Sequence, residues 1–219
     1  MAARPFPGRR SPVTAAALSP RHPVLADALN RHRSLGIDAA LVVAGAAIVA
    51  LLAQVEIPLP VVPITGQTLG VLLVGAALGA RRGAAALTAY MVAGLAGAPV
   101  FAGFSGSLAA VMTPSFGFIL GFIPAAYLAG WFAERSWDRR SWKAFAGFAA
   151  ASVVPFLVGV PYMAWILNAV MGASADLGQI LALGVTPFIA GGVVKAAIAA
   201  VAIPLAWRGV RAIDRSQRD

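Results

Sequence analysis

Long apolar stretches fill most of the chain between residues 37 and 207, and they limit the possible folds more than any other feature. Six of them can be separated, at residues 38–55, 66–80, 84–98, 115–133, 144–170 and 181–207. About 20 helical residues cross a hydrocarbon layer of about 30 Å, so each stretch is predicted to be a transmembrane helix, although the second and third are short and poorly separated. Their Ala, Leu, Val and Gly residues lack the polar–apolar alternation of a transmembrane β-strand. The predicted fold class is therefore an all-α integral membrane protein with six transmembrane helices.

The basic residues indicate how the helices cross the membrane. Sixteen of the seventeen Lys and Arg residues lie outside the apolar stretches, and all of them then fall on the same side. They are Arg4, Arg9, Arg10, Arg21, Arg31, Arg33, Arg81, Arg82, Arg135, Arg139, Arg140, Lys143, Arg208, Arg211, Arg215 and Arg218. The alternate connections, 56–65, 99–114 and 171–180, contain no Lys or Arg. Because Lys and Arg collect in cytoplasmic segments, this asymmetry predicts that both termini are cytoplasmic.

The same pattern divides the chain into three parts. Residues 1–36 are rich in Arg and Pro and lack an apolar run long enough for a signal-peptide core, which predicts a flexible, basic cytoplasmic tail that is not cleaved. Residues 37–207 form the predicted six-helix membrane domain, and residues 208–219 form a basic cytoplasmic C-terminal tail. The net charge of +9 predicts no nucleic-acid partner, because topology and anionic lipid headgroups account for basic residues at helix ends.

Several classes of function lack the residues that they need. The chain has no cysteine, which excludes disulfides, thiolate chemistry and iron–sulfur ligation. It has no G-x-x-x-x-G-K-[ST] phosphate loop, so it is not predicted to hydrolyse ATP itself. No pair of carboxylates lies within an apolar stretch, and His22 and His32 both fall in the predicted tail. We therefore predict that the protein is not an enzyme and has no catalytic residues, metal or cofactor.

Lys195 is the one basic residue inside an apolar stretch. A lysine in the middle of a span costs about 2.5–3.5 kcal/mol on insertion scales, and such residues usually face a polar interior. If the outer half of the last span begins near Pro187, Lys195 lies about 12 Å along the helix, too deep to reach the outer surface easily. No acidic residue lies at a comparable depth, so the partner could be the carboxylate of a bound substrate. The alternative is a structural lysine that bonds to helix carbonyls and to Asn168 or Tyr162.

Two connections without basic residues carry the polar groups of a possible cavity. Residues 56–68 form a proline-stiffened entry into the second span, with hydroxyl and amide side chains near its end. Residues 99–118 combine phenylalanine, serine, threonine and glycine. Irregular backbone at membrane depth is tolerated where it lines a cavity, and apolar walls with a few polar groups suit a small amphiphilic ligand. The alternative is that these segments only connect helices and that the phenylalanines form an interfacial belt.

Four segments resemble one family of membrane proteins. They are residues 62–83 (VPITGQTLGVLLVGAALGARRG), 90–103 (YMVAGLAGAPVFAG), 114–122 (PSFGFILGF) and 186–195 (TPFIAGGVVK). They are similar to BioY, the biotin-binding S component of energy-coupling factor (ECF) vitamin transporters. The resemblance implies a six-helix bundle in the bacterial plasma membrane that captures biotin from the extracellular side and closes its first and third loops over it. It also implies partners, namely a transmembrane coupling (T) protein and a pair of ATPases that drive import.

The resemblance implies roles for individual residues as well. In the family, the last helix usually reads Pro-Phe-x-x-Gly-Asp-x-x-Lys, where the lysine faces the substrate carboxylate and the aspartate accepts hydrogen bonds from the ureido ring. Lys195 matches the lysine, whereas Gly192 stands at the aspartate position. The resulting candidate substrate-binding residues are Lys195, Gly192, Thr65, Gln67, Tyr90, Phe101, Ser105, Ser107, Ser115 and Asn168.

The glycine at the aspartate position leaves two readings of the ligand open. Either Ser105, Ser107 or Asn168 contacts the ring instead, or the pocket serves another small carboxylate-bearing vitamin, precursor or analogue. A more distant alternative is a non-transport membrane scaffold or an intramembrane enzyme.

Small residues on the first predicted helix suggest a contact with the coupling protein. In the family this contact uses the spacing Ala-x-x-x-Ala, which Ala46 and Ala50 match, with Ala40 and Ala44 as a second register. Such spacing lets two helix backbones approach closely. The alternative is ordinary packing within the bundle, in a span that is rich in alanine.

Overall fold

The structure of the chain is a computed structural model that describes residues 24–29 and 34–216. Its elements, in chain order, are α1 (Leu25–Leu29), α2 (Leu35–Ala53), β1 (Glu56–Ile57), β2 (Ile64–Thr65), α3 (Gln67–Leu78), α4 (Ala80–Leu95), η1 (Ala102–Phe104), η2 (Leu108–Met112), α5 (Phe116–Ala133), η3 (Trp137–Arg139), α6 (Ser141–Trp165), η4 (Ile166–Val170), α7 (Leu177–Gly184) and α8 (Thr186–Ser216). Helices dominate, as predicted, and β1 and β2 form a short antiparallel hairpin. Most of the predicted N-terminal tail, with His22 and His32, lies outside the described residues.

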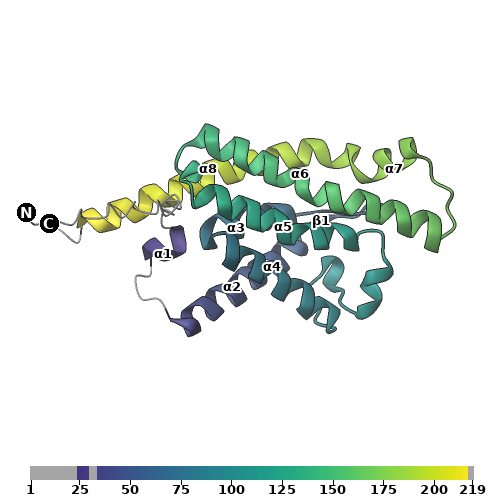
Figure 1. Ribbon diagram of the computed structural model, residues 1–219, viewed down its shortest axis with the longest axis horizontal. Coiled ribbons are helices and arrows are strands. Elements are labelled where there is room, and N and C mark those ends of the chain that lie inside the picture. The colour runs from purple at the N-terminus through teal and green to yellow at the C-terminus, as the bar shows by residue number, and fades with distance from the viewer. Residues whose placement is uncertain (1–23, 30–33, 217–219) are drawn as a thin grey trace, which may run out of the picture.

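Helix α5 is the centre of the bundle. It packs against α3, α4 and α6, and α6 in turn packs against α8 (Figure 1). Glycines on α5 permit this close approach: a Cβ on Gly121 would lie 2.7 Å from Pro155 Cα, and a Cβ on Gly130 would lie 2.3 Å from Ala80 N. Since interiors are close-packed, larger residues at these two positions would push α6 and the start of α4 away from α5.

Four helical segments of the described chain are long and apolar enough to cross a membrane. They are Leu35–Ala53, Phe116–Ala133, Ser141–Val170 and Leu177–Ala212. Helix α3 has 12 residues, or about 18 Å at ~1.5 Å per residue, which is well short of a ~30 Å hydrocarbon layer. All six predicted stretches thus contain helix, but length and composition support four full spans. The prediction of six crossings stays a prediction.

The predicted boundary between the second and third helices is wrong. We expected helices at 66–80 and 84–98 with the arginine pair between them. Instead α3 ends at Leu78 and α4 begins at Ala80, so Arg81 and Arg82 lie in the first turn of α4. Gly79 makes the break, because its φ of 87° lies in a region that glycine adopts without the steric cost of a side chain.

The predicted last span, 181–207, is divided into two helices. Asp176 starts α7 with a reciprocal cap: its carboxylate accepts from Gln179 N at 2.8 Å, and Gln179 Oε1 accepts from Asp176 N at 2.9 Å. Helix α7 ends at Gly184, and α8 starts with Thr186 and Pro187. A proline is favoured in the first turn because no helical partner is needed for its missing N–H. Helix α8 then continues to Ser216, beyond the predicted start of the C-terminal tail at residue 208.

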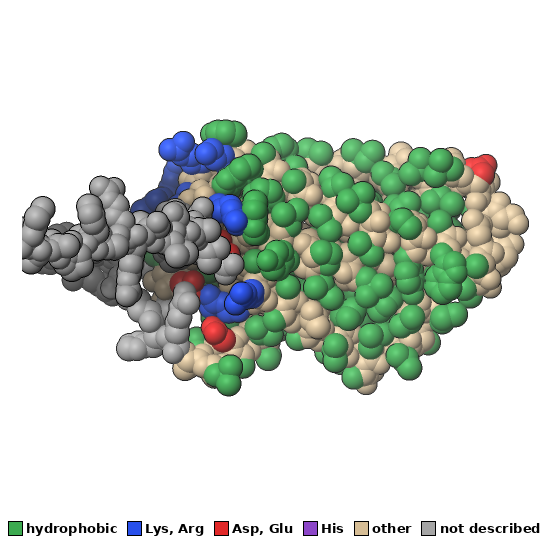
Figure 2. Space-filling model, in the orientation of Figure 1, with side chains coloured by type: hydrophobic (Ala, Val, Ile, Leu, Met, Phe, Trp, Pro, Cys, Tyr) green, Lys and Arg blue, Asp and Glu red, His purple; other side chains and the backbone are tan. Residues whose placement is uncertain are grey.

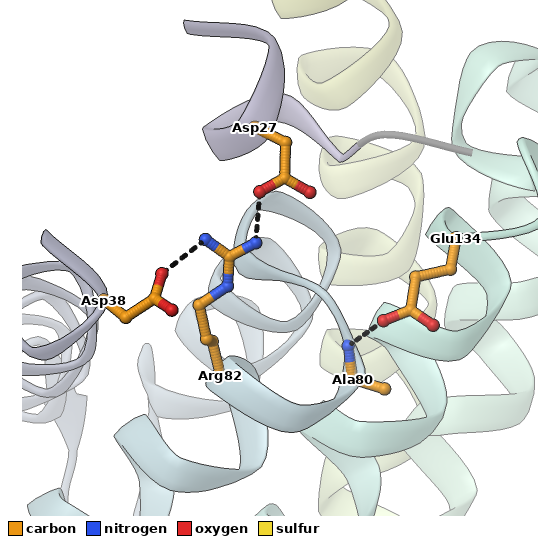
Figure 3. A network of polar contacts seen from close by, with 5 residues as sticks. All are labelled: Asp27, Asp38, Ala80, Arg82 and Glu134. Atoms are coloured by element: carbon orange, nitrogen blue, oxygen red, sulfur yellow. Dashed lines mark hydrogen bonds and ion pairs between the residues drawn. The ribbon is translucent and has the colours of Figure 1, made fainter. Parts of the chain in front are cut away.

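Lys and Arg side chains gather at one end of the bundle. Figure 2 shows Lys and Arg side chains near the end from which α8 extends, and hydrophobic side chains over much of the remaining face. At this end Arg82 pairs with Asp27 of α1 and donates to Asp38 Oδ1 of α2 at 3.2 Å (Figure 3). Glu134, just after α5, accepts from Ala80 N at 2.9 Å and so caps α4. Together these contacts join four helices at the basic end.

Candidate functional site

A cavity of about 360 Å³ lies between the β1–β2 hairpin, the loop that precedes α5, and helices α5, α6 and α8. Three phenylalanines form much of its apolar wall: Phe118 stacks on Phe188 with ring centroids 6.3 Å apart and meets Phe156 edge-on at 5.7 Å. The predicted site residues in the lining are Thr65, Gln67, Phe101, Ser105, Ser107, Ser115, Gly192 and Lys195. An apolar wall with a few polar groups, in a cavity of this size, is typical of sites for small molecules.

Lys195 reaches from α8 to the hairpin at the cavity wall. Its ammonium group donates hydrogen bonds to the Thr65 carbonyl at 2.5 Å and to Thr68 Oγ1 at 2.9 Å. The side chain is partly buried, and no carboxylate of the described residues forms an ion pair with it. An ammonium group has three donors, so one N–H of Lys195 remains for a group in the cavity. The lysine is therefore held in place by neutral oxygens while its charge stays unpaired.

A series of buried hydrogen bonds connects the hairpin to α3 and α4. Thr65 Oγ1 donates to Gln67 Oε1 at 2.7 Å, and Gln67 Nε2 donates to the Tyr90 hydroxyl at 2.5 Å. The Tyr90 ring meets the Phe101 ring edge-on, with centroids 5.4 Å apart. The Phe101 ring fits here because Gly94 has no side chain: a Cβ at Gly94 would lie 2.2 Å from Phe101 Cζ. Tyr90 was predicted to contact the ligand, but it lies behind the cavity lining, where it positions Gln67 and Phe101.

Gln54, which follows α2, holds residues 100–104 in place by hydrogen bonds. We call this segment the covering loop, and its Phe101 and Ala102 line the cavity. Gln54 Nε2 donates to the carbonyls of Phe101 at 3.1 Å and Val100 at 3.4 Å, and Gln54 Oε1 accepts from Phe104 N at 2.9 Å. One amide group therefore satisfies backbone groups of a segment that forms only a single turn of 3₁₀-helix, η1. Sequence reasoning missed Gln54, although a polar residue at the end of a long apolar stretch is a signal that could have identified it.

Two predicted partners of Lys195 lie elsewhere. Asn168, in the π-helical turn η4, donates to the Ala175 carbonyl at 3.1 Å and accepts from Ala175 N at 2.6 Å. Tyr162 donates to the Val111 carbonyl. The alternative in which Asn168 or Tyr162 bonds to Lys195 is therefore wrong in this point, because each of them bonds to the backbone of a connection instead. Asn168 also lies outside the cavity lining, whereas the other predicted contacts line the cavity or support it.

The small residues of α2 fall on two different faces. Ala46 and Ala50 are half-buried and pack against the core of the bundle. Ala40 and Ala44 are exposed. Of the two registers predicted for a helix contact, the second is therefore the one on the outer face of α2.

Some lining residues were not among the predicted contacts. Glu56, Thr68 and Ser152 all line the cavity. Thr68 has the clearest role, since it accepts from Lys195. Glu56 follows Gln54 closely, at the point where the first apolar stretch gives way to prolines, and this placement was its only signal in the sequence.

In the described part of the chain, apolar helices, four of them long enough to cross a membrane, surround a cavity of ligand size, and this arrangement defines a helical membrane protein. The chain matches the BioY family over residues 27–212. The putative biotin transporter BioYB of Bacillus subtilis is 42% identical over 102 residues, which are 47% of this chain and 50% of that protein. The biotin transporter BioY of Rhizobium etli is 36% identical over 148 residues, or 64% of this chain and 75% of that protein.

A solved structure shares the fold. The S-component for biotin from an ECF-type ABC transporter superposes with a TM-score of 0.61 at 20% identity, covering 81% of this chain and 95% of that chain. The chain belongs to the BioY family, as its sequence predicted.

Proposed function

We propose that the chain is the substrate-binding membrane subunit of a biotin uptake transporter. The relatives named as biotin transporters support this assignment. The observation that carries it is the Lys195 ammonium group, which borders the cavity with one N–H unused. Biotin has a carboxylate at the end of an aliphatic chain and a polar ring at the other end. Its carboxylate would pair with Lys195, and the three phenylalanines of the wall would cover its apolar parts.

The proposed orientation places both termini in the cytoplasm of a bacterial cell and the cavity toward the outer side. The basic residues at a single end of the bundle support it, because Lys and Arg collect on the cytoplasmic side (Figure 2). The cavity-lining loops come from connections that carry no Lys or Arg. In this arrangement six helices cross or enter the bilayer, with α3 and α4 as the two short ones.

We further propose that import depends on a coupling protein and ATPases. The chain has no phosphate loop of its own. Helix α2 is mostly exposed: 11% of its apolar 18-residue stretch is buried, against 61% of the corresponding stretch of α5. A coupling protein could pack on this face at Ala40 and Ala44, with lipid against the remaining apolar surface. Co-purification of these subunits from the native host tests the assembly, and uptake by this chain alone in a biotin-auxotrophic host would contradict it.

The test of ligand binding is isothermal titration of the detergent-purified protein with biotin. Lys195→Met removes the charge and keeps the apolar stem, so we expect a loss of at least about 100-fold in affinity, the size seen when a partner of a buried charge is removed. Lys143→Met is the matched control, because Lys143 lies at the start of α6 near the basic end. Tight binding that does not change in Lys195→Met would contradict the proposal.

The substitution Gly192→Asp tests whether biotin or another acid is the natural ligand. A Cβ at Gly192 would meet nothing within 4 Å, so a side chain can begin there without a steric clash. If the unaltered protein binds biotin, the cavity recognises the ring through groups other than an aspartate at position 192. If only Gly192→Asp binds biotin, the natural ligand is a different small carboxylate-bearing molecule.

A further inference from the structure

The lining of the cavity carries charge of both signs. Among its described residues, Glu56 and Lys195 are the two charged ones. They are attached to the same hairpin: Glu56 pairs with Thr65 across β1 and β2, and the Thr65 carbonyl accepts from Lys195. Paired positions of an antiparallel ladder have Cα atoms about 4.5–5.5 Å apart. Despite this shared anchor, the two side chains do not form an ion pair with each other.

The Glu56 carboxylate lies at the seam between the hairpin and the covering loop. A Cβ on Gly103 would lie 3.4 Å from Glu56 Oε1, so the carboxylate is next to the loop that Gln54 holds. Glu56 is partly buried, and its side chain makes no hydrogen bond or ion pair within the described part of the chain. A partly desolvated carboxylate has four lone-pair sites and gains from N–H donors.

The other side-chain oxygens of the described lining residues are neutral acceptors. Thr65 Oγ1 donates to Gln67, and Ser152 Oγ donates to the Phe148 carbonyl. The wall at Gly192 has no side chain at all. The Thr65 and Ser152 hydroxyls keep lone pairs that can accept, but Glu56 is the one carboxylate among the described lining residues and therefore the strongest acceptor.

We propose that Glu56 is the residue that recognises the N–H donors of the ligand's ring. The ligand would bridge the two charges, with its carboxylate on Lys195 and a ring that carries N–H groups on Glu56. The inference rests on the proposed function, and biotin fits it because its ureido ring has two N–H groups. The cavity would then reject a carboxylate of similar shape that has no N–H, since the Glu56 charge would be left without a donor.

The experiment is titration of the full chain with two ligands: biotin, and the thiolane pentanoic acid that keeps the sulfur ring and carboxylate of biotin but lacks the ureido group. In Glu56→Gln we expect the affinity for biotin to fall about 10- to 100-fold, because a hydrogen bond to a charged acceptor becomes a neutral one. The affinity for the analogue should stay the same or rise, because the analogue makes no such bond and the amide removes the unpaired charge that disfavours it. Glu134→Gln, the same substitution at the basic end, serves as the control and should leave both affinities unchanged.

A double variant keeps the test independent of folding. Glu56→Gln combined with Gly192→Asp returns a carboxylate to the cavity on α8, and we expect it to recover biotin affinity relative to Glu56→Gln alone. Equal effects of Glu56→Gln on both ligands, or no effect on biotin, would overturn the inference while leaving the proposed function intact. Failure of the unaltered chain to bind biotin would instead count against the proposed function itself.

Discussion

Lys195 donates a hydrogen bond to the backbone carbonyl of Thr65, which precedes it by 130 residues. This contact connects α8 to the β1–β2 hairpin, which lines the cavity. It also leaves the charge of the lysine without a counter-ion among the described residues. Lys195 thus has neutral oxygen partners on one side and the cavity on the other, which is the arrangement on which the proposed carboxylate contact depends.

Thr68 should contribute to ligand affinity through Lys195. Thr68→Val keeps the shape of the side chain and removes the hydroxyl that accepts from the ammonium group at 2.9 Å. We expect biotin affinity to fall about 10-fold, because a hydrogen bond to a charged group contributes about 1.5 kcal/mol. Thr88→Val is the control, since Thr88 bonds only to the Ala84 carbonyl of its own helix. Equal affinities of Thr68→Val and Thr88→Val, measured by titration, would disprove the role of Thr68.

Gln54 should control the mobility of the covering loop. Gln54→Leu removes both donor and acceptor, so amide hydrogen exchange at residues 100–104 should become faster, and biotin should dissociate faster. Gln54→Glu retains an acceptor for Phe104 N but loses the donors to two carbonyls, and an intermediate effect is expected. Exchange rates by mass spectrometry check both variants. Unchanged protection in Gln54→Leu would show that the loop is held by other contacts.

Arg82 should hold α1 against the bundle. Arg82→Ala breaks its pairs with Asp27 and Asp38, and we expect the free energy of unfolding to fall by about 1 kcal/mol, with faster exchange at residues 24–29. Asp38 is half-exposed, so most of the effect should come from Asp27. Arg81→Ala, at the exposed neighbouring position, is the control. If α1 stays equally protected in Arg82→Ala, the buried apolar residues of α1 suffice to hold it.

Asp138 should make stability depend on pH. It lies in η3, between the candidate spans α5 and α6, and burial raises its pKa to about 6, with the Trp207 N–H donor at 2.6 Å and Arg139 acting in the opposite direction. Because the folded pKa is above the unfolded one, the folded state binds the proton more tightly, and stability is lost as pH rises from about 4 through 6.

Asp138→Asn should remove this dependence. At pH 7.5 the variant avoids a desolvated charge and should be more stable relative to the unaltered chain than it is at pH 4.5. The difference should be about 2 kcal/mol, because about 1.5 units of the pKa shift act between these two pH values at ~1.4 kcal/mol per unit. Thermal unfolding in detergent at the two pH values measures it. A gap between variant and unaltered chain that is the same at both pH values would contradict the raised pKa.

The sequence by itself determined the helical class and the family, and it singled out Lys195 as the one basic residue inside an apolar stretch. Apolar runs must leave water, and a lysine inside one of them requires a polar surrounding, so both follow from composition and order along the chain. The separation of basic residues from the apolar runs is equally local information. The structure agrees with it, since the Lys and Arg side chains visible in Figure 2 lie near one end of the bundle.

Only the tertiary structure decided which groups meet in the cavity. The partners of Lys195 are Thr65 and Thr68, rather than Asn168 or Tyr162, because helix packing brings the hairpin and not η4 to that level of α8. The break at Gly79 and the hold of Gln54 on its loop likewise depend on backbone geometry and on neighbours far along the chain. Hydrogen-bond partners are chosen by distance in space after the bundle has packed, and apolar periodicity carries no record of that distance.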